Sequence, residues 1–128
     1  MKATINVVAG IVWQDGLYLA AQRPEGFPMA GWWEFPGGKI EPNEPREAAL
    51  VREFQEELDI TPTEYTFWRE LEHEYDKYHV RLHFFHIHKY SGELKSLENQ
   101  RTAWVDPKTP PTLEFLPADI AIVEALHI

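Results

Sequence analysis

The chain has no cysteine among its 128 residues. This absence excludes a disulfide framework, a thiolate nucleophile and a zinc site with sulfur ligands. It fits a reducing compartment, so we expect a cytoplasmic location. Long apolar runs are also missing, because the longest one near the N-terminus, Val7 to Trp13, is too short to span a bilayer. That run continues into a turn without a small-residue cleavage pattern, so we expect neither a signal peptide nor a membrane partner.

Positive charge is scarce. Lys and Arg number 12 against 21 Asp and Glu, which gives a formal net charge of −9 at pH 7. A general nucleic-acid binder needs a basic surface, so we expect no nucleic-acid polymer as a partner. A single nucleotide bound through a metal ion remains compatible with this charge. Hydrophobic residues at 44% and aromatic residues at 13% favour a folded core. The length suits one domain over residues 1–128, and we expect a monomer or a weak dimer.

The order of predicted elements indicates an α+β fold, with a mixed sheet, one long helix in the middle of the chain and another at its end. Strands are predicted at Ile5 to Trp13, Leu17 to Gln22, Tyr65 to Glu74, Tyr78 to Lys89 and Thr102 to Val105, with a short apolar segment at Trp32 to Phe35. Helices are predicted from Glu44-Pro45 to Asp59 and from Pro117 to Leu126.

Two details of these elements can be checked against a structure. Apolar and polar residues alternate along Tyr78 to Lys89 until Phe84-Phe85, which predicts a bulge there and a solvated face for His79 and His83. In the middle helix, Leu50, Val51, Phe54 and Leu58 share one arc that faces the core.

The opposite side of that helix is acidic. Glu53, Glu56 and Glu57 stand at i, i+3 and i+4, so the helix stacks three carboxylates on one face. A Glu-rich helix by itself is usually a solvated surface. Here Gly37-Gly38, Glu44 and Arg52 accompany it at fixed offsets, and adjacent glycines let backbone approach a ligand closely. Because Mg²⁺ takes oxygen ligands and often holds a substrate phosphate, the pattern predicts a metal site for a phosphorylated substrate.

These residues resemble the Nudix box, Gly-x5-Glu-x7-Arg-Glu-apolar-x-Glu-Glu-x-Gly-apolar. The chain matches it at Gly38, Glu44, Arg52, Glu53, Phe54, Glu56, Glu57 and Ile60. It departs from the pattern once, at Asp59, where the family has a glycine that suits an αL helix cap. Asp tolerates αL better than most residues, so we expect a small cost in stability. The segment Trp33 to Lys39 is similar to the approach to the box in MutT-type enzymes.

The resemblance implies a Nudix fold, a mixed sheet between helices, and hydrolysis of a nucleoside triphosphate to the monophosphate and pyrophosphate. Mg²⁺ is the implied cofactor, with Mn²⁺ as a substitute. Arg52 is expected to orient the glutamates, with Glu44 behind it, and Glu53 or Glu98 to act as the general base. The implied metal ligands are Glu53, Glu56, Glu57, Glu98 and a carbonyl of Gly37 or Gly38.

The rest of the substrate is assigned by the same resemblance. Arg23 and Lys39 are expected to bind phosphate, and Asp119, Phe35 and Tyr75 to bind the base. MutT-type enzymes that act on 8-oxo-dGTP often carry Asn at the position of Asp119. An ionised Asp only accepts hydrogen bonds, which suits cytosine N4, whereas a protonated one also donates. We therefore expect a broad range of (d)NTPs, with CTP, dCTP and modified pyrimidines slightly ahead of 8-oxo-dGTP.

Two other functions remain open. A Nudix module that binds a nucleotide without catalysis would be expected to lose glutamates of the box, and this chain keeps them. Cleavage of another nucleoside diphosphate derivative, such as a dinucleoside polyphosphate, a nucleotide-sugar or a 5′-triphosphate RNA end, would leave the metal site unchanged and alter only the substrate.

Overall fold

The computed structural model describes residues 2–127, so both ends of the predicted domain, Met1 and Ile128, lie outside it. The elements are β1 (Ala3–Gln14), β2 (Leu17–Gln22), β3 (Trp33–Glu34), β4 (Gly37–Lys39), α1 (Arg46–Leu58), β5 (Thr61–Glu74), β6 (Tyr78–Ser91), β7 (Thr102–Val105), the 3₁₀ turn η1 (Pro117–Asp119) and α2 (Ile120–Leu126). The predicted order is confirmed. None of the helices in residues 2–127 is long and apolar enough to cross a membrane.

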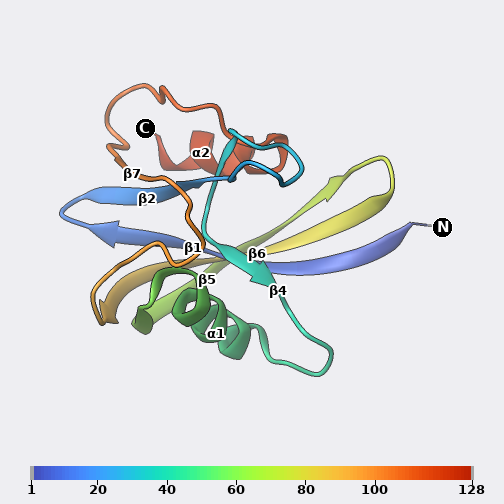
Figure 1. Cartoon of the computed structure of the whole chain (residues 1–128), viewed down its shortest axis with the longest axis horizontal. Helices are drawn as coiled ribbons and strands as arrows, with labels where there is room; N and C mark the ends of the chain where they lie inside the picture. The colour runs from blue at the N-terminus through green and yellow to red at the C-terminus, as the bar shows by residue number, and fades with distance from the viewer. Residues whose placement is uncertain (1, 128) are drawn as a thin grey trace.

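The sheet is mixed. Its strands run in the order β3-β2-β1-β6-β5, β4 pairs with β1, and β7 pairs with β2. The β1–β6 pair is parallel and continuous from Ala3 opposite Tyr78 to Val12 opposite Ile87, whereas the other named pairs are antiparallel. The long strands β1, β5 and β6 therefore form the frame from which the shorter strands extend (Figure 1).

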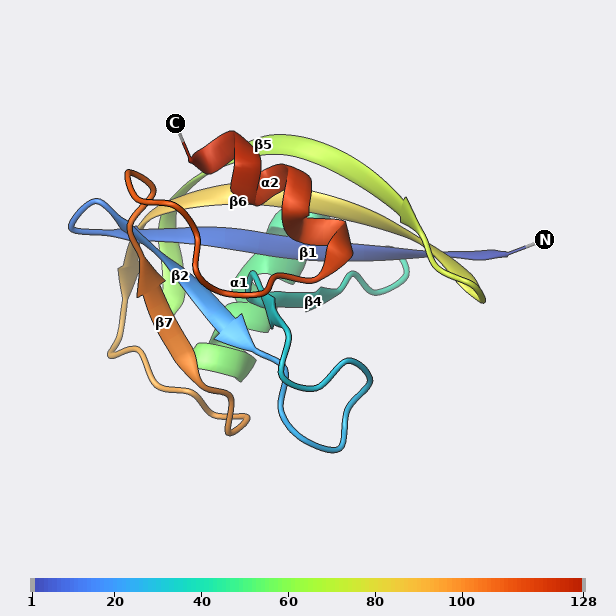
Figure 2. The ribbon, with the colours of Figure 1, turned by 90° about the horizontal axis from the view of Figure 1, so that it is seen from above.

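The two helices lie on opposite faces of this sheet, as the resemblance implied (Figure 1). Figure 2 shows α2 lying across β1 and β6. Each helix covers its own group of buried side chains. The α2 side includes Tyr18, Phe35, Phe84, Phe115 and Ile122, and the α1 side includes Val8, Leu50, Phe54, Phe85 and Ile87.

The two cores explain the consecutive phenylalanines of β6. Phe84 belongs to the core under α2 and Phe85 to the core under α1, so the alternation of side chains along β6 is not broken. The bulge lies on the neighbouring strand instead, where Phe67 and Arg69 of β5 face these two residues and Trp68 is the extra residue. The prediction of a bulge in β6 itself is therefore wrong.

A second correction concerns His83. Its side chain is buried, with 9% exposed, and its ring nitrogens contact Asn6 at 3.2 Å and Arg46 at 3.3 Å. The predicted solvated face is therefore wrong at this position, because the N-terminal end of α1 covers it. Burial lowers the pKa of His83, since the charged ring loses hydration.

Helix α1 begins after Pro45, close to the predicted start. Leu50, Phe54 and Leu58 are fully buried, whereas Val51 is only partly buried. Asp59 ends the helix in the αL conformation, with φ 58°, and its backbone N–H donates to the Phe54 carbonyl. An Asp therefore fills the cap position at which the resemblance expects glycine.

Candidate active site

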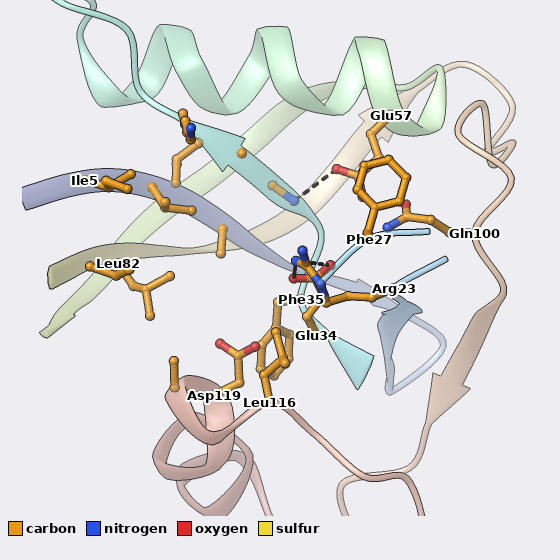
Figure 3. Close-up of a pocket in the computed structure, with 18 of the residues that line it drawn as sticks. Ile5, Arg23, Phe27, Glu34, Phe35, Glu57, Leu82, Gln100, Leu116 and Asp119 are labelled. Atoms are coloured by element: carbon orange, nitrogen blue, oxygen red, sulfur yellow. Dashed lines mark hydrogen bonds and ion pairs between the residues drawn. The ribbon is translucent and has the colours of Figure 1, made fainter. Parts of the chain in front are cut away.

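One cavity of about 770 Å³ gathers most of the predicted site residues. Its walls come from β1, the β2–β3 loop, the segment from β3 to β4, α1, the β5–β6 hairpin, the loop after β6, and η1. Figure 3 shows Glu57 of α1 at one end and Asp119 at the other, with Arg23 and Glu34 between them. The cavity is thus long enough to have a carboxylate end and a second, mostly apolar end.

Strand β4 brings backbone against the carboxylates because it lacks side chains at two positions. A Cβ on Gly37 would overlap the Val8 carbonyl oxygen and lie 2.8 Å from the Ala9 Cα. A Cβ on Gly38 would overlap the Glu53 carboxylate, with Oε1 at 2.6 Å. Both glycines line the cavity. The two-glycine segment therefore lets β4 pack closely on β1 and lets Glu53 lie directly against β4.

Glu57 is the buried carboxylate of the site, with 4% exposed. Its Oε2 accepts a hydrogen bond from the Gly37 backbone N–H at 3.1 Å. Burial, followed by the negative charges of Glu34 and Glu98, raises its pKa to about 8. Burial also raises the pKa of Glu53, although Arg52 opposes the rise. Two neighbouring carboxyl groups on one face of α1 therefore resist ionisation together.

Arg52 fixes the edge of this group. It binds Glu44 through two hydrogen bonds of 2.9 Å each, a bidentate arrangement. It also donates to Glu53 at 2.9 Å, to the Lys39 carbonyl at 3.0 Å and, at 3.5 Å, to Glu56. Hydrogen bonds from Arg52 lower the pKa of Glu44 to about 2. The guanidinium thus connects the loop before α1, strand β4 and Glu53.

The two remaining predicted ligands, Glu56 and Glu98, are exposed, and only Glu98 lines the cavity. The Glu56 side chain is 57% exposed, and its distance of 3.5 Å to Arg52 is longer than those of Glu44 and Glu53. Glu98 is exposed and lines the cavity. Its loop is fixed to the end of α1, because Lys95 N–H donates to the Leu58 carbonyl and Leu97 N–H to the Glu57 carbonyl, both at 2.9 Å.

The oxygen ligands at the carboxylate end of the cavity are of the type that a hard divalent cation prefers. Within residues 2–127, no three His, Cys, Asp or Glu side chains converge on one point as a preformed metal site. The available ligands are carboxylate and backbone carbonyl oxygens, which Mg²⁺ and Mn²⁺ prefer. Burial, and then the charge of neighbouring carboxylates, raises the pKa of Glu57, and a nearby cation would stabilise its ionised form. Glu53, Glu57, Glu98 and the carbonyls of Gly37 and Gly38 therefore fit such an ion.

Arg23 occupies the middle of the cavity and is already partnered. Its Nη1 donates to Glu34 at 3.2 Å, and its Nε donates to the Pro28 carbonyl at 2.7 Å. Burial raises the pKa of Glu34, and Arg23 opposes the rise. The predicted phosphate-binding Arg23 therefore also ties the β2–β3 loop to the cavity wall. Lys39, the other predicted phosphate ligand, is exposed at the rim.

The far end of the cavity holds the residues predicted to contact a base. Asp119 is buried, with 5% exposed, and burial followed by the charge of Glu34 raises its pKa well above 3.8. Phe35 is buried between Tyr18, Phe84 and Phe115, and its edge lines the cavity. Tyr75 also lines it and packs on the Tyr78 ring at 5.2 Å.

The lining residues that were not singled out from the sequence include Phe27, Glu34 and Gln100. Glu34 lies inside the quoted Trp33 to Lys39 segment, and its neighbours could have directed attention to it. Phe27 stands in a Pro- and Gly-containing loop and keeps 60% of its surface exposed. Gln100 follows Glu98 by two residues. Phe27 and Gln100 are loop residues that carry no periodic signal, so only the folded loops assign them to the cavity.

Comparisons with known proteins agree with this geometry. A model of the NUDIX domain matches residues 7–125. The CTP pyrophosphohydrolase of Escherichia coli K12 is 40% identical over 121 residues, covering 94% of this chain and 90% of the relative. The 8-oxo-dGTP diphosphatase of the same organism is 38% identical over 123 residues, covering 95% of each. The solution structure of the E. coli ORF135 protein superimposes with a TM-score of 0.84 at 40% identity, covering 97% of this chain and 89% of that one.

Proposed function

The chain belongs to the NUDIX-domain family, and from this premise we propose that it hydrolyses a nucleoside triphosphate to the monophosphate and pyrophosphate. The proposed substrates are CTP, dCTP and modified pyrimidine dNTPs, together with oxidised purines such as 8-oxo-dGTP. The names of two relatives, a CTP pyrophosphohydrolase and an 8-oxo-dGTP diphosphatase, support this range. Removal of damaged or unwanted nucleotides from the pool is the corresponding role.

One observation carries the proposal. Carboxylates at one end of a 770 Å³ cavity and a buried Asp119 at the other flank a space of the size that small-molecule ligands occupy. A nucleotide also has two chemically different ends, a polyanion and a planar base with hydrogen-bonding edges. The arrangement therefore supports a polyphosphate beside Glu53, Glu57 and Glu98 and a base beside Asp119.

We assign Mg²⁺, with Mn²⁺ as a substitute, to the carboxylate end. Glu53, Glu57 and Glu98 would hold it, together with the exposed Glu56 and a carbonyl of Gly37 or Gly38. When bound, the ion neutralises charge on the phosphate oxygens and assists ionisation of water. Arg52 keeps Glu53 oriented, while Glu44 holds Arg52 through two hydrogen bonds.

The chain's own groups supply the proton transfer. A water oxygen forms a bond to phosphorus while the bridging P–O bond between the α- and β-phosphates breaks, and the water loses a proton to a carboxylate. Glu53 is the favoured base, because its carboxylate lies against β4 and is held by Arg52. Glu98, on the facing loop, is the alternative base. Arg23 and Lys39 offer positive charge along the polyphosphate.

Recognition of the base depends on the protonation of Asp119. Burial and the charge of Glu34 raise its pKa well above 3.8, which favours the neutral acid. A neutral carboxyl group donates one hydrogen bond and accepts another. That pair matches the N3 acceptor and N4 donor of cytosine, and equally the adjacent donor and acceptor of other bases. A neutral Asp119 thus favours a broad substrate range, with Phe35 and Tyr75 as apolar walls.

The decisive experiment measures kcat/KM with Mg²⁺ for CTP, dCTP, 5-methyl-dCTP, 8-oxo-dGTP and dGTP, following pyrophosphate release. We expect turnover of several of these, with differences of about tenfold or more between the best and the worst. Absence of turnover for all five would contradict the proposal. Equal values for all five would show that Asp119 does not discriminate between bases.

A matched variant separates an enzyme from a binding module. Glu53→Gln keeps the shape of the side chain and removes the proposed base, so kcat should fall by about 10²- to 10⁴-fold. Glu124→Gln, an exposed position on α2, serves as the control and should retain wild-type kcat. Nucleotide binding without turnover in the wild-type protein would favour the non-catalytic alternative.

A further inference from the structure

The last residue that the structure describes, His127, joins two segments that are distant in the sequence. Its Nε2 lies 2.7 Å from the Tyr18 hydroxyl of β2, and its Nδ1 lies 2.8 Å from the Thr109 carbonyl oxygen. Because a carbonyl oxygen only accepts, Nδ1 carries the hydrogen of the neutral ring, and Nε2 accepts from the Tyr18 hydroxyl. Neither ring lines the cavity, so these contacts have no part in the proposed reaction itself.

Tyr18 depends on this partner. Its side chain is fully buried, and within residues 2–127 its hydroxyl forms a hydrogen bond only with His127. A buried hydroxyl without a partner is unfavourable, so the folded chain keeps the His127 ring beside β2. The residue is also fixed to α2, because the His127 backbone N–H donates to the Val123 carbonyl at 3.0 Å. The end of α2 is therefore held against β2 and against the segment that carries Thr109.

The contact with Tyr18 reaches a wall of the cavity. The Tyr18 and Phe35 rings pack at 5.8 Å between centroids, with 35° between their planes. Phe35 lines the cavity at the end proposed for the base, and it also packs on Phe115 at 5.6 Å. Because side chains in a core are closely packed, a shift of Tyr18 would be transmitted to Phe35 by direct contact.

The contact with Thr109 reaches Asp119. Thr109 lies in the segment 106–116, which leads from β7 to η1 and the start of α2 (Figure 2). At the end of this segment, the Leu116 carbonyl accepts a hydrogen bond from the Asp119 backbone N–H at 2.9 Å. Helix α2 begins directly after Asp119. His127 therefore holds both the segment before Asp119 and the helix after it.

We propose that His127 positions two residues expected to contact the base, Phe35 and Asp119, an inference that rests on the proposed function. His127 acts through Tyr18 and Thr109, and it is not itself a ligand of the nucleotide or of the metal ion. The carboxylate end is built on α1 and β4, and the hydrogen bonds of His127 go instead to β2, α2 and the segment 106–116. Loss of its ring should therefore weaken recognition of the base and preserve the chemical step on a bound nucleotide.

The test compares the wild-type protein with three variants and one control. His127→Phe keeps a ring and removes both nitrogens, whereas His127→Gln keeps a side-chain acceptor for the Tyr18 hydroxyl. Tyr18→Phe breaks the same hydrogen bond from the other side, and it carries the test if His127→Phe does not fold. His88→Phe, at an exposed position of β6 outside the cavity, is the matched control. The readouts are Tm and, at a temperature where each variant is folded, kcat and KM with Mg²⁺ for CTP, dCTP, 8-oxo-dGTP and dGTP.

For His127→Phe we expect KM of the best triphosphate to rise by about 3- to 10-fold, the factor that corresponds to one hydrogen bond of ordinary strength. Its kcat should stay within about twofold of wild type, and the ratio of kcat/KM between the best and the worst triphosphate should shrink by about threefold. Its Tm should fall, because the Tyr18 hydroxyl loses its partner. Tyr18→Phe should raise KM as well. His127→Gln should lie between wild type and His127→Phe, and His88→Phe should match wild type.

Three results would overturn the inference while leaving the proposed function intact. Wild-type KM and substrate ratios in His127→Phe would show that the contacts serve the fold alone. A fall in kcat by the same factor for all four nucleotides, with KM unchanged, would place the effect at the carboxylate end. A KM for His127→Gln as high as that for His127→Phe would show that the bond to Tyr18 is not the link. Inactivity of the wild-type protein would instead contradict the proposed function, and the inference with it.

Discussion

At the scale of single residues, Asp119 is a buried acidic side chain. It is buried at the far end of the cavity, near Glu34 and Tyr75, with Arg23 as the opposing charge. Its protonation state decides whether it presents a donor and an acceptor or acceptors alone. The protonation of Asp119, which we propose to govern base recognition, is therefore also linked to folding stability.

This linkage gives a prediction with a defined sign. The pKa of Asp119 is near 3.8 in the unfolded chain and well above that value in the folded protein, so the folded protein binds more protons. The protonated Asp119 therefore contributes to stability fully below pH 3.8, and this contribution is lost as pH rises through the folded-state pKa. Asp119→Asn cannot ionise, so its Tm should decline less than that of wild type between pH 4 and 8.5. Thermal unfolding across this range checks it, and parallel curves for the two proteins would contradict it.

The residue scale is also where sequence reasoning was least complete. The spacing of three glutamates indicated one shared helix face, and all three, Glu53, Glu56 and Glu57, lie on α1. The spacing could not indicate that Glu57 is buried and Glu56 exposed, because that depends on how β4 packs against the helix. Nor could it indicate that Arg23 is bonded to Glu34 and Pro28, since these partners meet only when the β2–β3 loop folds back.

At the scale of elements, β4 shows how a three-residue strand can determine a site. It pairs with β1 from Val7 to Ala9 on one side and meets α1 on the other. Space for a side chain is absent at Gly37 and Gly38, for two different reasons. Gly37 is confined by backbone of β1, which cannot move easily, and Gly38 is confined by the flexible side chain of Glu53.

A pair of alanine substitutions separates packing from backbone conformation. Gly37→Ala places a Cβ against the Val8 carbonyl, so we expect the free energy of unfolding to fall by about 2–3 kcal/mol. Gly16→Ala is the control, because Gly16 has φ of +80° but nothing within 4 Å; its cost should be about 1 kcal/mol. Urea unfolding measures both. Equal losses would mean that the close approach of β4 to β1 contributes little.

Most elements could be predicted from the sequence because their signals are local. Pro45 near the first turn and Asp59 at the last fixed the ends of α1 closely, and β2 and β7 have the predicted bounds. The prediction at Phe84-Phe85 was wrong because two adjacent apolar residues have two explanations. They can mark a bulge, or they can be buried on opposite faces of a regular strand, as they are here. Choosing between these explanations requires knowing that α2 covers the face of β6 that carries Phe84 and α1 covers the face that carries Phe85.

At the scale of the whole molecule, part of the excess of acidic residues lies along the cavity. The formal charge is −9, and the site places Glu34, Glu53, Glu57 and Glu98 close enough that Glu57 is perturbed by the other three. Folding therefore brings these acidic side chains close to one another. A divalent ion bound beside these acids should therefore raise the free energy of unfolding, in addition to any effect on activity.

This expectation can be measured without turnover. At ten times the Kd, Mg²⁺ should stabilise the folded state by about 1.4 kcal/mol, or roughly 5 °C in Tm. Sodium chloride at matched ionic strength is the control for general screening. At pH 8, Glu57→Gln should raise Tm without Mg²⁺, because a buried carboxylate is removed, and should reduce the Mg²⁺-dependent shift. Identical shifts in NaCl and MgCl₂ would contradict a specific site.

The hydrogen bonds that close α1 have a wider consequence. The last carbonyls of the helix, on Glu57 and Leu58, are satisfied by amides of Leu97 and Lys95, some forty positions later in the chain. The end of the helix and the loop after β6 therefore hold each other in place. Added or deleted residues between Gly92 and Glu98 should disrupt these two hydrogen bonds and displace the loop. The number of residues between β6 and Glu98 is therefore constrained by the two hydrogen bonds to the end of α1.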